Sequence, residues 1–109
     1  EDLGDLENYF QFSMKKLKKS SGRYLKLPGS SQVAAGVVFK KPFYIAPGCK
    51  IGDRAVIGPF AIIGERCEIG EGANIERSII FPETAIASGR TISHQIAMPG
   101  QEIQINADL

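Results

Sequence analysis

A six-residue repeat constrains the fold of this chain more than any other feature of its sequence. From residue 45 the sequence divides into the hexads IAPGCK, IGDRAV, IGPFAI, IGERCE, IGEGAN and IERSII. Isoleucine opens all six hexads, glycine follows it in four, and the fifth position is small in five. An amphipathic helix would repeat every ~3.6 residues and a lone strand every ~2, so neither explains this period. A short strand, a bend and another short strand explain it, with the large and the small apolar position both facing inward.

The period extends beyond these hexads in both directions. Counting back in sixes reaches Phe39 and Val33, and the next clear isoleucines along the chain are Ile86 and Ile92. The gap from Ile75 to Ile86 is eleven residues rather than twelve. The sequence therefore predicts one turn that is a residue short.

These hexads resemble those of the hexapeptide-repeat family, whose fold is a left-handed parallel β-helix with three hexads in each coil. The resemblance implies a mainly β protein, with a left-handed β-helix over residues 33–105 and one α-helix before it. Residues eighteen apart should then lie in adjacent coils, so Ile45 is expected beside Ile63 and Ile51 beside Ile69. The glycine that follows each isoleucine is expected where a side chain would not fit at the bend.

The same spacing makes predictions for two further pairs. Cys49 and Cys67 both occupy the small inward position of their hexads, so we interpret them as reduced thiols that fill space in adjacent coils. Lys50 and Glu68 occupy an outward position, which suggests an ion pair on the surface that contributes at most about 1 kcal/mol.

Residues 5–21 have the pattern of an amphipathic helix. Asp5 is a plausible N-cap, lysines gather in the last turns, and Ser20-Ser21-Gly22 is expected to end the helix. A helix this apolar needs a surface to cover, either the exposed first coil of the β-helix or a catalytic domain that precedes it. The apolar stripe consists of Leu6, Tyr9, Phe10, Met14 and Leu17, with Phe12 beside it.

The origin of this helix has two readings. Residues 5–14 read DLENYFQFSM, which is close to the tag-removal protease site ENLYFQ followed by SM. To be a remnant of that site, the segment must have lost a leucine and gained a phenylalanine, whereas a native helix needs no edit. We interpret the segment as native; in the other reading the domain begins at Met14.

The N-terminus carries a second resemblance. The stretch EDLGDLENY is similar to the segment that ends the catalytic domain of sugar-1-phosphate nucleotidyltransferases, also called NDP-sugar pyrophosphorylases. Asp2-Leu3-Gly4 matches the core of that motif, and the residues from Leu6 to Tyr9 match its helix start. Many of those enzymes then enter a hexapeptide β-helix, and the stretch IERSIIFPETAI also resembles theirs.

The resemblance implies a function for the parent protein. Such enzymes make an NDP-sugar from an NTP and a sugar 1-phosphate with Mg²⁺, and Asp2 matches one of two carboxylates that hold the metal. Their other catalytic residues would lie upstream, so we expect no catalytic or cofactor-binding residue in this fragment, which would serve assembly or regulation. The implied organisation is residues 1–22 as the end of the catalytic domain with its helix, 23–32 as a linker, 33–105 as the β-helix and 106–109 as a tail.

Two other functions remain open. Hexapeptide-repeat acyltransferases use a histidine base to activate an acceptor, and the single histidine here is His94. The chain could also be a purely structural oligomerisation module, and in either case we expect a homo-oligomer formed through the β-helix. Zinc carbonic anhydrases of this fold are excluded, since they need three histidine ligands.

Composition excludes further classes. The net charge of +1 gives no global argument for nucleic acid, and no apolar run approaches the ~20 residues that span a membrane. Two cysteines without a disulfide framework favour a reducing compartment, so we expect a cytoplasmic protein. Pro59 and Phe60 project from an expected corner and suggest either a contact with another chain or domain, or a turn. The irregular stretch AMPGQEIQI suggests a terminal cap.

Overall fold

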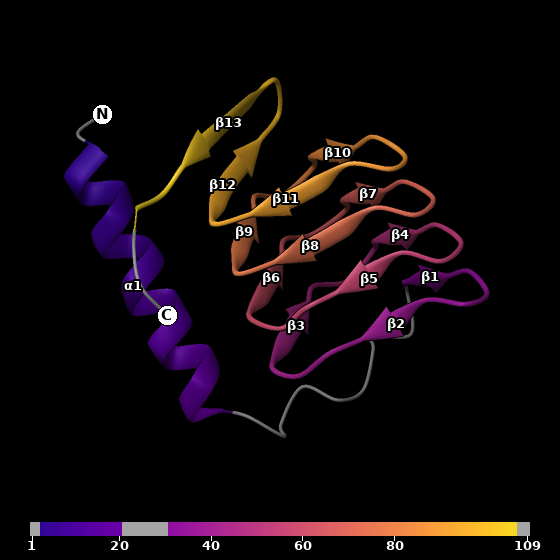
Figure 1. Ribbon diagram of the computed structural model, residues 1–109, viewed down its shortest axis with the longest axis horizontal. Coiled ribbons are helices and arrows are strands. Elements are labelled where there is room, and N and C mark those ends of the chain that lie inside the picture. Colours follow the sequence, from indigo (N-terminus) through magenta and orange to yellow (C-terminus); the bar gives the residue numbers. More distant parts are fainter. Residues whose placement is uncertain (1–2, 21–30, 107–109) are drawn as a thin grey trace.

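A single helix followed by short strands makes up the chain in the computed structural model, which describes residues 3–20 and 31–106 (Figure 1). Helix α1 spans Leu3–Lys19, and all later elements are strands that wind into a parallel β-solenoid. The strands are β1 (Gln32–Val33), β2 (Val38–Phe39), β3 (Phe43–Ile45), β4 (Lys50–Ile51), β5 (Val56–Ile57), β6 (Ala61–Ile63), β7 (Glu68–Ile69), β8 (Asn74–Glu76), β9 (Ser78–Ile80), β10 (Ala85–Ile86), β11 (Thr91–Ser93), β12 (Gln95–Met98) and β13 (Gln101–Gln104).

The strands form three parallel sheets, one on each face of the solenoid. The first face contains β1, β4, β7 and β10, and the second contains β2, β5, β8 and β11. The third face contains β3, β6, β9 and β12, and β13 extends it in the antiparallel direction. The predicted fold class, a mainly β parallel helix with one α-helix before it, is confirmed.

The predicted register is also confirmed. Ile45 pairs with Ile63 and Ile51 pairs with Ile69, each eighteen residues along the chain. From the next coil the spacing falls to seventeen, since Ala61 pairs with Ser78. The missing residue is at the corner between the second and third faces. Three residues, 58–60, lie between Ile57 and Ala61 there, whereas two, 76–77, lie between their register partners Ile75 and Ser78.

The core of the solenoid follows the two apolar positions of the hexad. The first-position isoleucines and the small fifth-position residues are buried, among them Cys49 and Cys67, which have no exposed surface. At Gly52, Gly64 and Gly70 the next coil rather than the turn explains the glycine, whereas Gly58 has a φ of 101° and a Cβ there would meet the Lys40 carbonyl of the preceding coil. A Cβ on Gly52 would lie 2.8 Å from the backbone nitrogen of Glu71, and one on Gly70 would lie 2.5 Å from that of Ser88. Because the coils stack this closely, only glycine fits.

Most corners of the solenoid turn on a residue in the left-handed backbone region, although the corner between β2 and β3 does not. Glycines such as Gly36 and Gly72 supply this conformation, but so do residues with side chains. These residues repeat from coil to coil in columns, because each corner recurs every seventeen or eighteen residues. The non-glycine members are Arg54, Phe60, Arg66, Arg77, Glu83 and His94.

Ion pairs link neighbouring coils at these corners. Arg54 pairs with Glu71, and Arg66 pairs with Glu83 at 3.1 Å. The expected pair of Lys50 and Glu68 is wrong: the two residues are register partners, but no ion pair among the described residues joins them. The ion pairs between coils join residues of the turns instead, Arg54 with Glu71 and Arg66 with Glu83.

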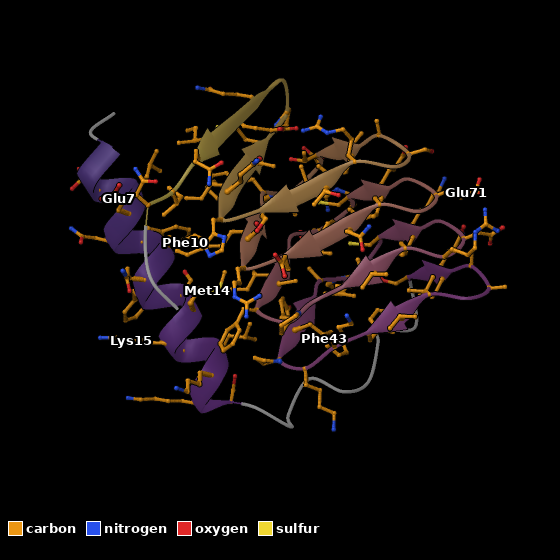
Figure 2. All side chains as sticks on the ribbon, in the orientation of Figure 1. Glu7, Phe10, Met14, Lys15, Phe43 and Glu71 are labelled. Atoms are coloured by element: carbon orange, nitrogen blue, oxygen red, sulfur yellow. The ribbon has the colours of Figure 1, made fainter. Side chains whose placement is uncertain are left out.

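Helix α1 packs against the outer side of the third face, beside the whole stack of coils (Figure 1). Phe10 and Met14 point toward the strands whereas Lys15 points away, as Figure 2 shows. They contact an outward apolar column of register partners in that face. This column consists of Tyr44, Ile62, Ile79 and Ile96.

Three expectations about the helix need correction. It covers a side of the solenoid rather than its first coil, because the third face is apolar on both surfaces. It begins at Leu3, so Asp5 lies in its first turn instead of capping it. Tyr9 and Phe12 are 48% and 66% exposed, although Tyr9 makes an edge-on contact with Phe81. The end expected at Ser20-Ser21-Gly22 lies partly outside the described residues.

Two smaller features have structural roles. Phe60 turns the corner and is partly buried against the apolar cluster that α1 shares with the third face, so it packs against residues of this chain. The stretch after Ile92 forms a hairpin of β12 and β13 in which Ile96 pairs with Ile103. This hairpin caps the third face, because β13 occupies the edge where a further coil would have added a strand.

Candidate functional site

The residue that the sequence places in a metal site, Asp2, lies outside the described residues. Helix α1 begins directly after it, at Leu3. The other candidate, His94, lies at the corner between β11 and β12, in the same column as Phe60 and Arg77. Polar and charged side chains gather around His94, so it is the candidate site that the structure allows us to build.

A chain of hydrogen bonds reaches His94 from the coil below. The Ser93 hydroxyl donates to Glu76 Oε2 at 2.9 Å, and the same hydroxyl oxygen lies 3.0 Å from His94 Nδ1. Ser93 and Glu76 are register partners on β11 and β8, which explains why side chains seventeen residues apart meet. Arg77 Nη1 donates to the other carboxylate oxygen of Glu76 at 2.9 Å. We call Glu76, Arg77, Ser93 and His94 the corner cluster.

The backbone of the corner cluster is held as firmly as its side chains. Ile105 N–H donates to the His94 carbonyl at 2.7 Å, and the Gln104 amide donates to the same oxygen at 3.1 Å. The Ser78 hydroxyl donates to the Glu76 carbonyl at 2.7 Å. These bonds fix the left-handed turn at His94, because the end of β13 returns beside it.

His94 was predicted from the sequence as a candidate residue, but its hydrogen-bond partners were not. The signal was available, since Glu76 and Ser93 stand seventeen residues apart, the length of the shortened coil. To pair Glu76 with Ser93 from the sequence, one would need to know which corner of the shortened coil lacks a residue. Gln95 is the next side chain along, and its Oε1 is buried without a hydrogen-bond partner among the described residues.

The two cysteines do not form a reactive site. Burial raises the pKa of the Cys49 thiol and of the Cys67 thiol above the ordinary value. The Cys49 thiol donates to the Gly64 carbonyl at 3.1 Å, and the Cys67 thiol donates to the Phe81 carbonyl at 3.1 Å. Both cysteines are free, and the interpretation of space-filling thiols in adjacent coils agrees with this geometry.

Two hollows lie beside the sheet faces, and a third of about 340 Å³ is lined by residues such as Arg90, Met98 and Glu102 near the terminal hairpin. An open trough of about 630 Å³ runs over the first face, lined by Lys50 and Glu68 beside the bare backbone of Gly52 and Gly70. A smaller hollow of about 280 Å³ lies between α1 and the third face, where Lys16 and Tyr44 line it. None of these hollows is lined by a member of the corner cluster.

The described part of the chain contains neither a cluster of metal ligands nor a membrane-spanning helix. No group of three or more His, Cys, Asp or Glu side chains there could hold a metal ion. Within residues 3–20 and 31–106, no helix is long and apolar enough to cross a membrane.

Comparisons with known proteins extend the argument beyond the corner cluster. The family described as GMPPB C-terminal domain matches residues 39–108, which run from the end of β2 past the terminal hairpin. The chain is also similar to the bifunctional protein GlmU of Syntrophomonas wolfei subsp. wolfei, with 38% identity over 87 residues. That alignment covers 74% of this chain but 18% of the relative's length. The chain therefore spans less than a fifth of the curated relative it matches.

Proposed function

Because this chain belongs to the GMPPB C-terminal domain family, we propose that it is the C-terminal β-helix region of a nucleotidyltransferase that makes an NDP-sugar. The observation that carries the proposal is the family match over residues 39–108. The N-terminal stretch EDLGDLENY supports it independently, since it resembles the end of the catalytic domain in sugar-1-phosphate nucleotidyltransferases. The solenoid and α1 would follow that domain in the same order.

The reaction of the parent protein is nucleotidyl transfer. A phosphate oxygen of the sugar 1-phosphate attacks the α-phosphorus of the NTP, a new P–O bond forms, and the bond to the β-phosphate breaks to release pyrophosphate. Mg²⁺ neutralises the phosphate oxygens when it is bound, and Asp2 would supply one of its carboxylate ligands. This fragment supplies no other catalytic group, so by itself it would be inactive.

The role of the fragment is then assembly or regulation. We propose that the β-helix joins copies of the parent protein into a homo-oligomer. The exposed valines of the first coil support this role, because Val33 is 37% exposed at a position where later coils bury isoleucine. Sedimentation of the full-length protein tests it, and a monomer at every concentration would remove it. Localisation in the cytoplasm stays a prediction, to be tested by fractionation.

Helix α1 has a specific place in this proposal. The apolar side of the helix packs against the solenoid, and its first residue follows Asp2 directly. The helix would therefore tie the metal-binding loop of the parent enzyme to the solenoid along most of its height. An assembly contact on the solenoid would restrain that loop through a packed helix.

The experiment that tests the activity uses the full-length protein that carries this domain. Pyrophosphate release is followed with Mg²⁺ and a panel of NTPs and sugar 1-phosphates. Release that requires both substrates supports the proposal. If no pair in the panel releases pyrophosphate from a folded protein, the proposal is wrong.

The acyltransferase alternative, with His94 as base, has one supporting observation, the hydrogen-bond chain through Ser93 to Glu76. The hollows described above are not lined by members of the corner cluster, so they offer this base no adjoining acyl-donor groove. Titration calorimetry with acetyl-CoA tests it, and a flat trace ends it.

A further inference from the structure

The order of groups in the corner cluster fixes where the protons are. A carboxylate accepts hydrogen bonds and has none to donate, so the Ser93 hydroxyl donates its proton to Glu76. A hydroxyl has one proton, and this proton is already in use. Toward His94 the Ser93 oxygen can therefore only accept, and the donor in that 3.0 Å contact must be His94 Nδ1.

We infer that Glu76 and Ser93 hold neutral His94 in the tautomer that carries its proton on Nδ1, and that Nε2 is thereby kept as a fixed hydrogen-bond acceptor. Among the interactions that the structure describes, none engages Nε2. The chemical class that fits this atom is a hydrogen-bond donor, such as a hydroxyl or a protonated amine. The corner between β11 and β12 is thus a binding point for such a group on a ligand.

Rigidity distinguishes this arrangement from an ordinary surface histidine. Arg77 holds the second oxygen of Glu76, so the carboxylate cannot rotate freely to release Ser93. Ile105 and Gln104 hold the His94 carbonyl, so the turn itself is fixed. A free acceptor on a fixed ring costs less entropy to engage than one on a mobile side chain.

The same geometry excludes a different function. In a nucleophilic triad the hydroxyl stands at the end of the chain and gives its proton to the histidine. Here the hydroxyl stands between histidine and carboxylate, and its proton points to the carboxylate. Ser93 is therefore a positioning residue and not a nucleophile.

Nitrogen-15 NMR of the imidazole tests the tautomer, and the single histidine of the chain gives an unambiguous signal. At about pH 8.5, where an ordinary imidazole is neutral, Nδ1 should resonate as a protonated nitrogen and Nε2 as an unprotonated one. Glu76→Gln keeps the side-chain size but offers an amide donor to Ser93. The direction of the chain then reverses, and the proton should move to Nε2.

Two further variants complete the experiment. Ser93→Ala removes the relay, so the histidine should show the mixture of tautomers seen in a free imidazole. Glu71→Gln, at a corner on another edge of the solenoid, should leave the spectrum of His94 unchanged. A wild-type spectrum with the proton on Nε2, or one that neither Glu76→Gln nor Ser93→Ala changes, would overturn the inference.

Accessibility of Nε2 is tested with diethyl pyrocarbonate, a reagent that acylates neutral imidazole nitrogens. The wild-type chain should react at His94 at a rate comparable to that of an unstructured histidine peptide. A histidine that reacts only after the chain is unfolded would show that Nε2 is covered, and the site would then be withdrawn. Neither outcome depends on whether the parent protein is a nucleotidyltransferase.

Discussion

Gly70 lies directly beneath Ser88 in the next coil, so close that a Cβ added to Gly70 would come within 2.5 Å of the Ser88 backbone nitrogen. Gly72, two residues later, has open space around it but a φ of 72°. The two glycines are thus required for different reasons, one by the approach of two backbones and the other by the turn.

These reasons predict different costs of substitution. Gly70→Ala should lower the free energy of unfolding by roughly 3 kcal/mol or more, because the coils must separate to admit the methyl group. Gly72→Ala should cost only about 1–2 kcal/mol of left-handed backbone strain. Urea denaturation of both variants checks this order. Equal or reversed costs would mean that the coils do not stack as closely as described.

The packing of α1 is tested by two phenylalanines on opposite sides of the helix. Phe10 has no exposed surface, so Phe10→Ala should cost roughly 3–5 kcal/mol and increase hydrogen exchange along the helix. Phe12 is 66% exposed, so Phe12→Ala should stay within about 0.5 kcal/mol of the wild type. Similar effects for the two variants would show that the helix does not dock on the third face.

The corner columns predict that glycine is preferred to alanine at Arg54. Arg54 adopts a φ of 59°, and its ion pair with Glu71 is exposed, with 70% and 52% of the two side chains accessible. Both variants lose the ion pair, but only Arg54→Ala keeps the left-handed strain. Arg54→Gly should therefore be more stable than Arg54→Ala by about 1 kcal/mol in thermal or urea unfolding. An alanine variant as stable as the glycine variant would contradict the turn geometry.

The buried thiols predict a pH dependence of stability. Because burial raises their pKa in the folded chain above the ordinary value of 9.0, the unfolded chain loses these protons first as the pH rises. The stability they contribute is complete below that value and declines as the pH passes through it toward the folded pKa. Native thiols should also react with a maleimide only as fast as the chain opens.

The matched control for this prediction replaces Cys67 by alanine, the residue at the equivalent position in neighbouring hexads. Its free energy of unfolding should decline less steeply above about pH 9 than that of the wild type. An identical decline in the variant would show that other groups cause it.

Much of this architecture could be predicted from the sequence, for a physical reason. A repeat that buries the same side chain in every coil fixes the register, so the partners of Ile45 and Ile51 follow from counting. The shortened coil was visible as the eleven-residue gap after Ile75. The corner that lacks the residue could not be identified from this gap, since local backbone geometry decides which turn is shortened.

The surface on which α1 docks could not be predicted from the repeat alone. Tyr44, Ile62 and Ile79 follow one another at eighteen and seventeen residues and lie outside the hexad core, so an apolar outer column could have been found in the sequence. Which surface the helix would cover still depended on competition between that column and the exposed first coil. The corner cluster was hidden for a similar reason, because Glu76 meets Ser93 only once the seventeen-residue register is known.

The measurement that tests the central proposal most directly is pyrophosphate release by the full-length protein with and without Asp2→Asn. With Mg²⁺, an NTP and the matching sugar 1-phosphate, the wild type should turn over and the variant should be at least about a hundredfold slower, because a metal ligand is lost. Asp5→Asn, three residues later in the first turn of α1, should change the rate little. A wild-type protein without this activity, or an Asp2→Asn variant as active as Asp5→Asn, would contradict the account.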